Sequence, residues 1–162
     1  MPDVYLILGA NLGDRIKNLQ KATDHISRDI GKIADRSSIY ETEPWGFNCG
    51  SDFLNQILKV NTSLKPEEVL SEIISIEKVC GRKIKSKKYE AREIDIDILF
   101  YNDIIFRSDK LVIPHPDIQE RMFVLVPMAE LQPDFMHPVL QKPISFLKEG
   151  CNDRRWVREY KH

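Results

Sequence analysis

The chain has 162 residues, of which 42% are hydrophobic and 30% charged, and this length and balance predict a single globular domain over residues 1–162. The formal net charge of -1 excludes a global electrostatic field for nucleic acid or an anionic membrane, and no stretch approaches the roughly 18 apolar residues of a membrane span. The N-terminal apolar run is too short to predict a signal peptide and no basic residues precede it, and three widely spaced cysteines suggest neither disulfides nor zinc, so we expect a cytoplasmic protein.

The first part of the chain alternates strand and helix signals. Residues 3–9 are typical of a buried strand. Residues 11–14 combine turn formers with an N-cap aspartate, and the amphipathic helix that follows should end at Gly31. Residues 33–40 and 53–62 predict two further strands, joined by a loop.

A second helix and a strong strand follow. Pro66 is suited to a first helical position, and Gly81 should close the helix that it opens. The basic loop 82–92 comes next, and residues 94–101 then predict a strand. We expect residues 103–106 to pair back on that strand through a tight turn.

This order of elements defines the fold class. Strand, helix, strand, strand, helix, strand is the order of an α+β, ferredoxin-like β-α-β-β-α-β sandwich. Such a domain has an antiparallel sheet with helices packed on its faces. Because the fold hosts many functions, the chemistry has to be inferred from particular residues.

Two aspartates in the last of these strands are the first candidates. In a strand the side chains alternate, so Asp95 and Asp97 share one face, with Cα atoms about 7 Å apart. Aspartate is depleted in strands, and like charges on one face repel. Either the face is solvated near lysines, or the pair holds a hard divalent cation such as Mg²⁺, which takes carboxylate oxygens together with substrate phosphates.

The basic loop precedes this pair directly. Six of its eleven residues are Lys or Arg, including Arg82 and Arg92. Alone, the run could be a solvated surface, but beside a metal-binding carboxylate pair it favours polyphosphate binding. Glu77, beside the apolar stripe of the second helix, is either a surface residue or an acceptor for ribose hydroxyls or an adenine amino group.

Aromatic and polar residues suggest a second ligand. Arg121 and Phe123 should alternate along a strand, so that both point into one cleft. Phe53 and Phe123 could each be core residues, but two aromatics on neighbouring strands can also sandwich a flat heterocycle. Asn55 shares a strand face with Phe53, and its amide, which both donates and accepts, matches the polar edge of such a heterocycle, while His115 between two prolines is either structural or a site residue.

Seven motifs in order resemble the 6-hydroxymethyl-7,8-dihydropterin pyrophosphokinase family over nearly the whole chain. The motifs are LGANLGD near the start, YETEPWG at 40–46, FLN at 53–55, GR at 81–82, AREIDIDI at 91–98, PHP at 114–116 and RMF at 121–123. The resemblance implies a ferredoxin-like transferase of folate biosynthesis. It would move the β,γ-diphosphate of ATP to the hydroxyl of 6-hydroxymethyl-7,8-dihydropterin and release AMP.

The resemblance also assigns roles to residues. Asp95 and Asp97 would hold two Mg²⁺ ions, and Arg82, Arg92 and the two aspartates would be catalytic. The residues implied for ATP are Glu77, Ile98, Lys110, Leu111, Val112, His115 and Arg121. The residues implied for the pterin are Thr42, Pro44, Trp45, Phe53, Asn55 and Phe123.

Two other functions are compatible with parts of this pattern. One is another Mg²⁺-dependent nucleotidyl or pyrophosphoryl transferase with a different acceptor. The other is an RNA-binding ferredoxin-like module, which the missing aromatic signature and the near-neutral charge disfavour. We expect small-molecule substrates and neither nucleic acid nor membrane as a partner. Association with other folate-pathway enzymes is left open.

Overall fold

The computed structural model describes residues 1–43, 52–81 and 93–161. Its main feature is a six-stranded antiparallel sheet in which β5, β1, β4, β3 and β8 are neighbours in that order and β2 also pairs with β4. The strands are β1 (Asp3–Ala10), β2 (Gly31–Arg36), β3 (Tyr40–Thr42), β4 (Phe53–Thr62), β5 (Asp95–Tyr101) and β8 (Val157–Glu159). The helices are α1 (Arg15–Asp29), α2 (Pro66–Val79), η1 (Ile118–Glu120), α3 (Met122–Leu131) and α4 (Ile144–Glu149).

The order of these elements confirms the ferredoxin-like prediction. The β4 strand has the bounds predicted for it, and Pro66 begins α2 as expected. Asp14 is the N-cap of α1, where its carboxylate accepts from the Lys17 amide at 3.1 Å. The predicted strand 33–40 is instead two strands, β2 and β3. Between them Ser37 donates its amide to the Ile57 carbonyl and accepts from the Ile57 amide through its hydroxyl.

Gly31 has a different role from the predicted one. The α1 helix ends at Asp29, and Gly31 begins β2 opposite Thr62. A Cβ at this position would lie 1.9 Å from the Asn61 carbonyl oxygen. Glycine is therefore needed for the close approach of β2 to β4, rather than to end the helix.

The predicted pairing of residues 103–106 with β5 is wrong. Two short strands, β6 (Phe106–Arg107) and β7 (Val112–Ile113), pair with each other in a separate sheet. The chain after β7 occupies the edge of β5 instead, since the His115 amide donates to the Leu99 carbonyl at 3.0 Å. That edge is consequently not available to β6.

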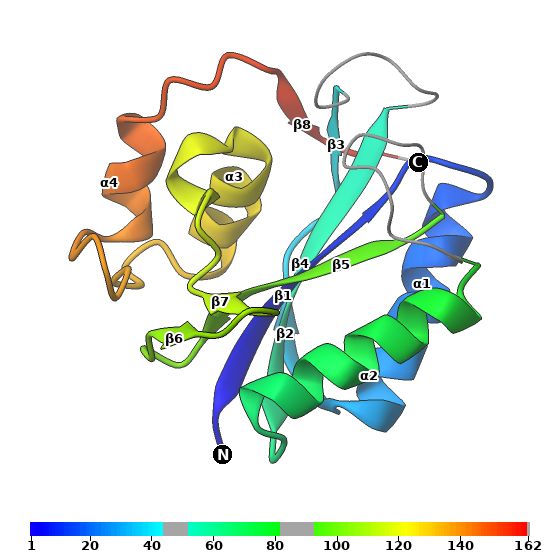
Figure 1. Ribbon diagram of the computed structural model, residues 1–162. Helices are drawn as coiled ribbons and strands as arrows, with labels where there is room; N and C mark the ends of the chain where they lie inside the picture. The colour runs from blue at the N-terminus through cyan, green and yellow to red at the C-terminus, as the bar shows by residue number, and fades with distance from the viewer. Residues whose placement is uncertain (44–51, 82–92, 162) are drawn as a thin grey trace.

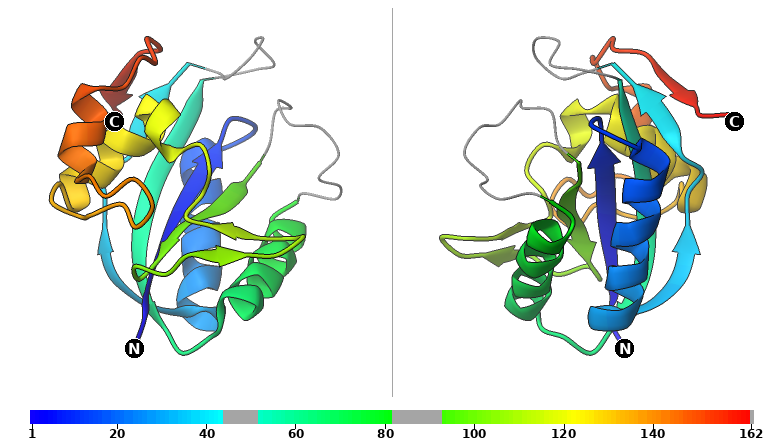
Figure 2. Two further views of the ribbon diagram at one scale, coloured as in Figure 1. Left: turned by 60° about the vertical axis from the view of Figure 1, so that its left-hand side comes forward. Right: turned by 90° about the vertical axis from the view of Figure 1, so that its right-hand side faces the viewer.

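Alternation along the central strands produces two hydrophobic cores. Leu6 and Leu8 of β1 point toward α1 and α2, whereas Tyr5 and Ile7 point toward α3 and α4. The two helix pairs lie on opposite sides of the sheet (Figures 1 and 2). No helix in the described part of the chain is long and apolar enough to cross a membrane.

Candidate active site

The β5 strand places two carboxylates on one face of the sheet, as predicted. Ile96 and Ile98 are 1% and 5% exposed and belong to the core beneath α1 and α2. Asp95 and Asp97 alternate with them, are half-buried, and lie on the opposite face. Ile7 pairs with Asp97 and packs in the core beneath α3, so the carboxylates lie where that core ends.

Gly9 links this carboxylate pair to the neighbouring strand. In the sheet register Gly9 is opposite both Asp95 of β5 and Asn55 of β4, so Asp95 and Asn55 lie on the same face. A Cβ at Gly9 would come within 2.9 Å of Asn55 Oδ1 and 3.8 Å of a Phe53 ring carbon. Because Gly9 has no side chain, the Asn55 amide can occupy the space over β1.

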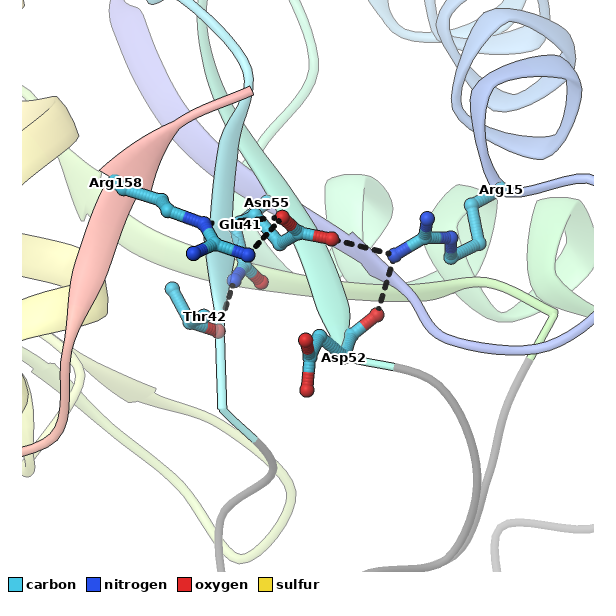
Figure 3. Close-up of polar contacts among 6 residues, drawn as sticks. All are labelled: Arg15, Glu41, Thr42, Asp52, Asn55 and Arg158. Atoms are coloured by element: carbon cyan, nitrogen blue, oxygen red, sulfur yellow. Dashed lines mark hydrogen bonds and ion pairs between the residues drawn. The ribbon is translucent and has the colours of Figure 1, made fainter. Parts of the chain in front are cut away.

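Asn55 is held by the next strand. Its side chain is 4% exposed, and Nδ2 donates to the hydroxyl of Thr42 at 3.0 Å (Figure 3). Thr42 pairs with Phe53 across β3 and β4, which keeps Phe53 on this face. A buried amide, a hydroxyl and a half-buried aromatic ring thus lie beside the carboxylates.

His115 joins the site from the segment that follows β7. Its Nδ1 accepts from the Asp117 amide at 3.2 Å. Burial lowers the pKa of His115, although the negative charge of Asp97 opposes this, and the nearby Arg121 lowers the pKa further. The imidazole therefore lies in the combined field of Asp97 and Arg121.

Arg121 and Phe123 lie together, but the predicted strand is wrong. Arg121 is the extended N-cap residue of α3, with φ -130° and ψ 107°, and Phe123 is in the first turn of that helix. The Arg121 guanidinium donates to Asp117 Oδ2 at 3.1 Å, and its carbon is 5.7 Å from the centroid of the Phe123 ring. Phe123 therefore comes from a helix that covers the sheet, not from a strand next to Phe53.

A residue far along the chain caps the N-terminus of α3. The side chain of Asp153 is almost fully buried, and its Oδ2 accepts from the amide of Met122 at 3.1 Å. Burial opposes its ionisation, but the amides of Arg155 and Met122 and the Arg155 guanidinium outweigh burial and hold the pKa of Asp153 below its usual range. Asp153 is therefore a positioning residue for Arg121 and Phe123.

The surface interpretation of Glu77 is wrong. Glu77 is 4% exposed, and Oε2 accepts from the Ile96 amide at 2.9 Å, at the outer edge of β5. The Glu77 carboxylate is thus fixed beside the strand that carries the two aspartates.

The other residues expected at the nucleotide differ in exposure. Ile98 and Leu111 have core side chains, whereas Lys110 is exposed and Val112 is half-buried in β7.

An ion-pair cluster behind this face was not identified from the sequence. Arg15 donates to Glu41 Oε2 at 3.3 Å and to the Asp52 carbonyl at 2.8 Å, and Arg158 contacts Glu41 Oε1 at 3.0 Å (Figure 3). The cluster ties β3 to the start of α1 and to β8, and it ties α1 to the residue before β4. These residues come from distant segments, and no sequence pattern linked them.

Four of the expected residues, Pro44, Trp45, Arg82 and Arg92, lie outside the described residues. Within the described ranges no group of three His, Cys, Asp or Glu side chains could hold a metal ion. The donor set is two carboxylates on one strand face. It fits Mg²⁺, which is usually bound through one or two carboxylates and completed by water and substrate phosphates.

Comparison with known proteins identifies sequence relatives over most of the chain. Residues 5–133 match the family model of 7,8-dihydro-6-hydroxymethylpterin-pyrophosphokinase. The 2-amino-4-hydroxy-6-hydroxymethyldihydropteridine pyrophosphokinase of Aquifex aeolicus is 43% identical over 91% of this chain and 91% of its own length. The Porphyromonas gingivalis protein of that name is 39% identical over 88% of this chain and 99% of its own.

Longer proteins contain a similar domain. The folic acid synthesis protein fol1 of Pneumocystis carinii is 43% identical over 93% of this chain, which spans 20% of that protein. The wild-type HPPK-DHPS crystal structure from Plasmodium falciparum superposes with a TM-score of 0.71 at 20% identity, over 92% of this chain and 43% of that one. The chain spans less than half of such structures, and at this identity they show the fold alone.

Proposed function

We propose an assignment of substrates and metal to this site from the premise that the chain belongs to the 7,8-dihydro-6-hydroxymethylpterin-pyrophosphokinase family. Membership makes it an ATP-dependent pyrophosphokinase of folate biosynthesis, with ATP and the pterin as substrates. One observation carries the assignment: Asp95, Asp97 and Asn55 lie on one sheet face around Gly9. Carboxylates for a metal-bound polyphosphate and an amide for a heterocycle are thereby adjacent.

In the proposed reaction the pterin hydroxyl attacks the β-phosphorus of ATP in line. The bond from this phosphorus to the α,β-bridging oxygen breaks, AMP leaves with that oxygen, and the hydroxyl proton passes to solvent. Such a transfer depends mainly on positioning and on neutralising the charge that develops. No general base among the described residues is required by this scheme.

Asp95 and Asp97 would hold two Mg²⁺ ions. Bound there, Mg²⁺ would supply charge neutralisation on the phosphates and lower the pKa of the attacking hydroxyl. The half-buried position of both carboxylates, at the edge of the core, supports this role over a solvated surface pair. His115 and Arg121 would bind phosphate oxygens next to them, together with Arg82 and Arg92.

The rest of the nucleotide would lie along the edge of β5 and β7. Glu77 is already fixed at that edge and would accept from the ribose or the adenine amino group. Ile98 and Leu111 have buried side chains, so we expect their backbone groups to meet the nucleotide. Lys110 and Val112 would cover it from the segment around β7.

The pterin would stack between Phe53 and Phe123, with Asn55 bonding its edge and the backbone near Thr42, Pro44 and Trp45 completing the contacts. The Thr42 hydroxyl holds the Asn55 amide through Nδ2, which orients the amide before the ligand arrives. The half-buried rings of Phe53 and Phe123 on one side of the sheet support a flat ligand between them.

We expect Gly9→Ala to raise the KM for the pterin about tenfold, the effect of one misplaced hydrogen bond worth roughly 1.4 kcal/mol. The new methyl group would lie 2.9 Å from Asn55 Oδ1, so the amide has to move. Gly150→Ala is the matched control, because its Cβ meets nothing closer than 3.7 Å. Steady-state kinetics with Tm measured alongside test this, and an unchanged pterin KM would contradict the role of Asn55.

The reaction itself is tested by the nucleotide product. With ATP and Mg²⁺ we expect AMP only when 6-hydroxymethyl-7,8-dihydropterin is present, in equal amount to the pyrophosphorylated pterin. Release of ADP, or of AMP without the pterin, would indicate a different transferase. Single-stranded RNA binding without turnover would favour the RNA-binding module.

The organisation of the protein in the cell is a further part of the proposal. We infer a single pyrophosphokinase domain over residues 1–162, located in the cytoplasm and able to associate with other enzymes of folate synthesis. The fol1 proteins and the HPPK-DHPS chains support such association, because a similar domain is part of a longer chain there.

A further inference from the structure

Tyr40 lies in the row of residues that crosses the sheet at the candidate site. In the sheet register Tyr40 of β3 is opposite Asn55 of β4, and Asn55 is in turn opposite Gly9 of β1. Such cross-strand neighbours lie on one face of a sheet, with Cβ atoms about 5 Å apart. Tyr40 therefore borders Asn55 on the side away from Gly9. It is not among the residues expected to bind either substrate.

One carboxylate of α3 fixes Tyr40 and the segment before it. Glu130 Oε1 accepts from the Tyr40 hydroxyl at 2.9 Å and from the Ser38 amide at 3.0 Å. Its Oε2 accepts from the Ser38 hydroxyl at 2.8 Å. Burial and the hydrogen bond to Glu130 raise the pKa of Tyr40 to about 12, so at neutral pH the hydroxyl keeps its proton and donates. Both oxygens of the carboxylate are therefore used to hold this part of the chain against α3.

The helix is the rigid partner in this contact. Val124, Leu125 and Met128 of α3 are buried in one core with Ile57 of β4. The β3 strand has only three residues, and so has β8, its neighbour on the side away from β4. A short strand makes few ladder hydrogen bonds, so side-chain contacts contribute more to its position. Glu130 therefore fixes β3 relative to the helix and the sheet.

The position of β3 in turn determines the orientation of the Asn55 amide. Asn55 Nδ2 donates to the hydroxyl of Thr42, which lies two residues after Tyr40 on the same strand face. Oδ1 lies over Gly9, where the absence of a side chain leaves room. The amide is thus bounded by β3 on one side and by open space on the other. A shift of β3 would allow the amide to turn.

We propose that Tyr40 and Glu130 are positioning residues for pterin recognition and act through Asn55. Glu130 fixes Tyr40 against α3, and the fixed strand presents the Asn55 amide in the orientation that meets the edge of the pterin. The inference rests on the proposed place of the pterin beside Asn55. Neither positioning residue touches a substrate or a metal ion.

Glu130→Ala should raise the KM for the pterin about tenfold, the effect of one misplaced hydrogen bond, and should change kcat and the KM for ATP less than about twofold. The nucleotide should be insensitive because Arg121, at the other end of α3, is held by Asp117 and not by Glu130. This difference between the two substrates separates positioning of Asn55 from a general loosening of α3.

Two milder variants test the contact itself. Tyr40→Phe keeps the ring and loses the hydroxyl, so it should raise the pterin KM about three- to tenfold. Glu130→Gln keeps an acceptor oxygen for the Tyr40 hydroxyl and the Ser38 amide and should restore the wild-type KM. The double variant Tyr40→Phe/Glu130→Ala should be no worse than Glu130→Ala, because both changes remove the same contact.

Glu149→Ala and Tyr160→Phe are the matched controls. Glu149 is exposed at the end of α4, and Tyr160 packs against the core on the opposite face of the sheet. Both variants should leave the pterin KM unchanged. Tm is measured for every protein, and Tyr40→Phe, which keeps the ring, tests the proposal even if Glu130→Ala does not fold.

The side-chain amide of Asn55 gives a second measurement, on the free protein. In NMR spectra we expect its two Nδ2 proton signals to shift in Tyr40→Phe and Glu130→Ala and to keep their wild-type positions in Glu130→Gln and both controls. Unshifted signals in Glu130→Ala, or a wild-type pterin KM in that variant, would each overturn the proposal. Gly9→Ala distinguishes this failure from failure of the proposed function. If its pterin KM rises while that of Glu130→Ala does not, only the positioning role is wrong, whereas a wild-type KM in both would show that Asn55 does not bind the pterin.

Discussion

We expect Asp97→Asn to lower turnover by about 10³-fold or more, because the metal contribution to such a transfer is several kcal/mol and each 1.36 kcal/mol is tenfold in rate. The amide keeps the shape of the side chain but loses the charge that holds a hard cation. Metal-dependent ATP binding should fall in the same variant. Asp97→Ala should behave in the same way.

The fold should not suffer from this change. Asp95 and Asp97 carry like charges on one strand face, so removing one charge should leave the free energy of unfolding unchanged or raise it by about 0.5 kcal/mol. Asp103→Asn, in the exposed turn after β5, is the matched control and should keep full activity. AMP release and Tm measured on the three proteins decide the question. Near wild-type activity of Asp97→Asn would mean that the pair is only solvated.

Phe123→Ala should weaken pterin binding about 5- to 150-fold and change nucleotide affinity less than about twofold. The expected loss is that of one stacking face, roughly 1–3 kcal/mol by analogy with bases stacked on aromatic side chains. Arg121 lies 5.7 Å from the ring but also pairs with Asp117, which should hold it near the phosphates without Phe123.

Phe146→Ala is the control for this experiment. Phe146 is 54% exposed on α4, where Lys142 lies over its ring, and it should affect neither ligand. Titration calorimetry with the pterin and with a non-hydrolysable ATP analogue gives both affinities. A loss of equal size for the two ligands would show that Phe123 is simply a core residue of the layer around α3.

Patterns in short stretches of the sequence predicted the features that depend only on neighbouring residues, such as strand alternation and helix capping. The period of two in β5 predicted that Asp95 and Asp97 share a face, and the N-cap at Asp14 predicted the start of α1. Both features depend on residues within one or two turns of the chain. The shared face of the two carboxylates could therefore be predicted from the sequence alone.

The remaining features depend on contacts between distant segments. Phe123 was expected on a strand, but Asp153 caps the α3 helix from thirty-one positions away, and no local signal reports this. Residues 103–106 were expected to pair with β5, whose edge the chain at His115 occupies. The Arg15–Glu41 ion pair likewise joins α1 to β3. Tertiary packing determined each of these outcomes, and the local secondary-structure propensity of the sequence could not predict them.

We propose that the metal-bound phosphates of the nucleotide lie on the sheet face formed by β1, β4 and β5. The most direct test replaces Mg²⁺ with paramagnetic Mn²⁺ in the presence of a non-hydrolysable ATP analogue and follows the amide NMR signals. We predict the strongest broadening at Asp95, Asp97 and Gly9, little broadening in β2, and loss of the effect in Asp97→Asn. Broadening centred on another part of the chain, or equal in wild type and Asp97→Asn, would contradict the claim.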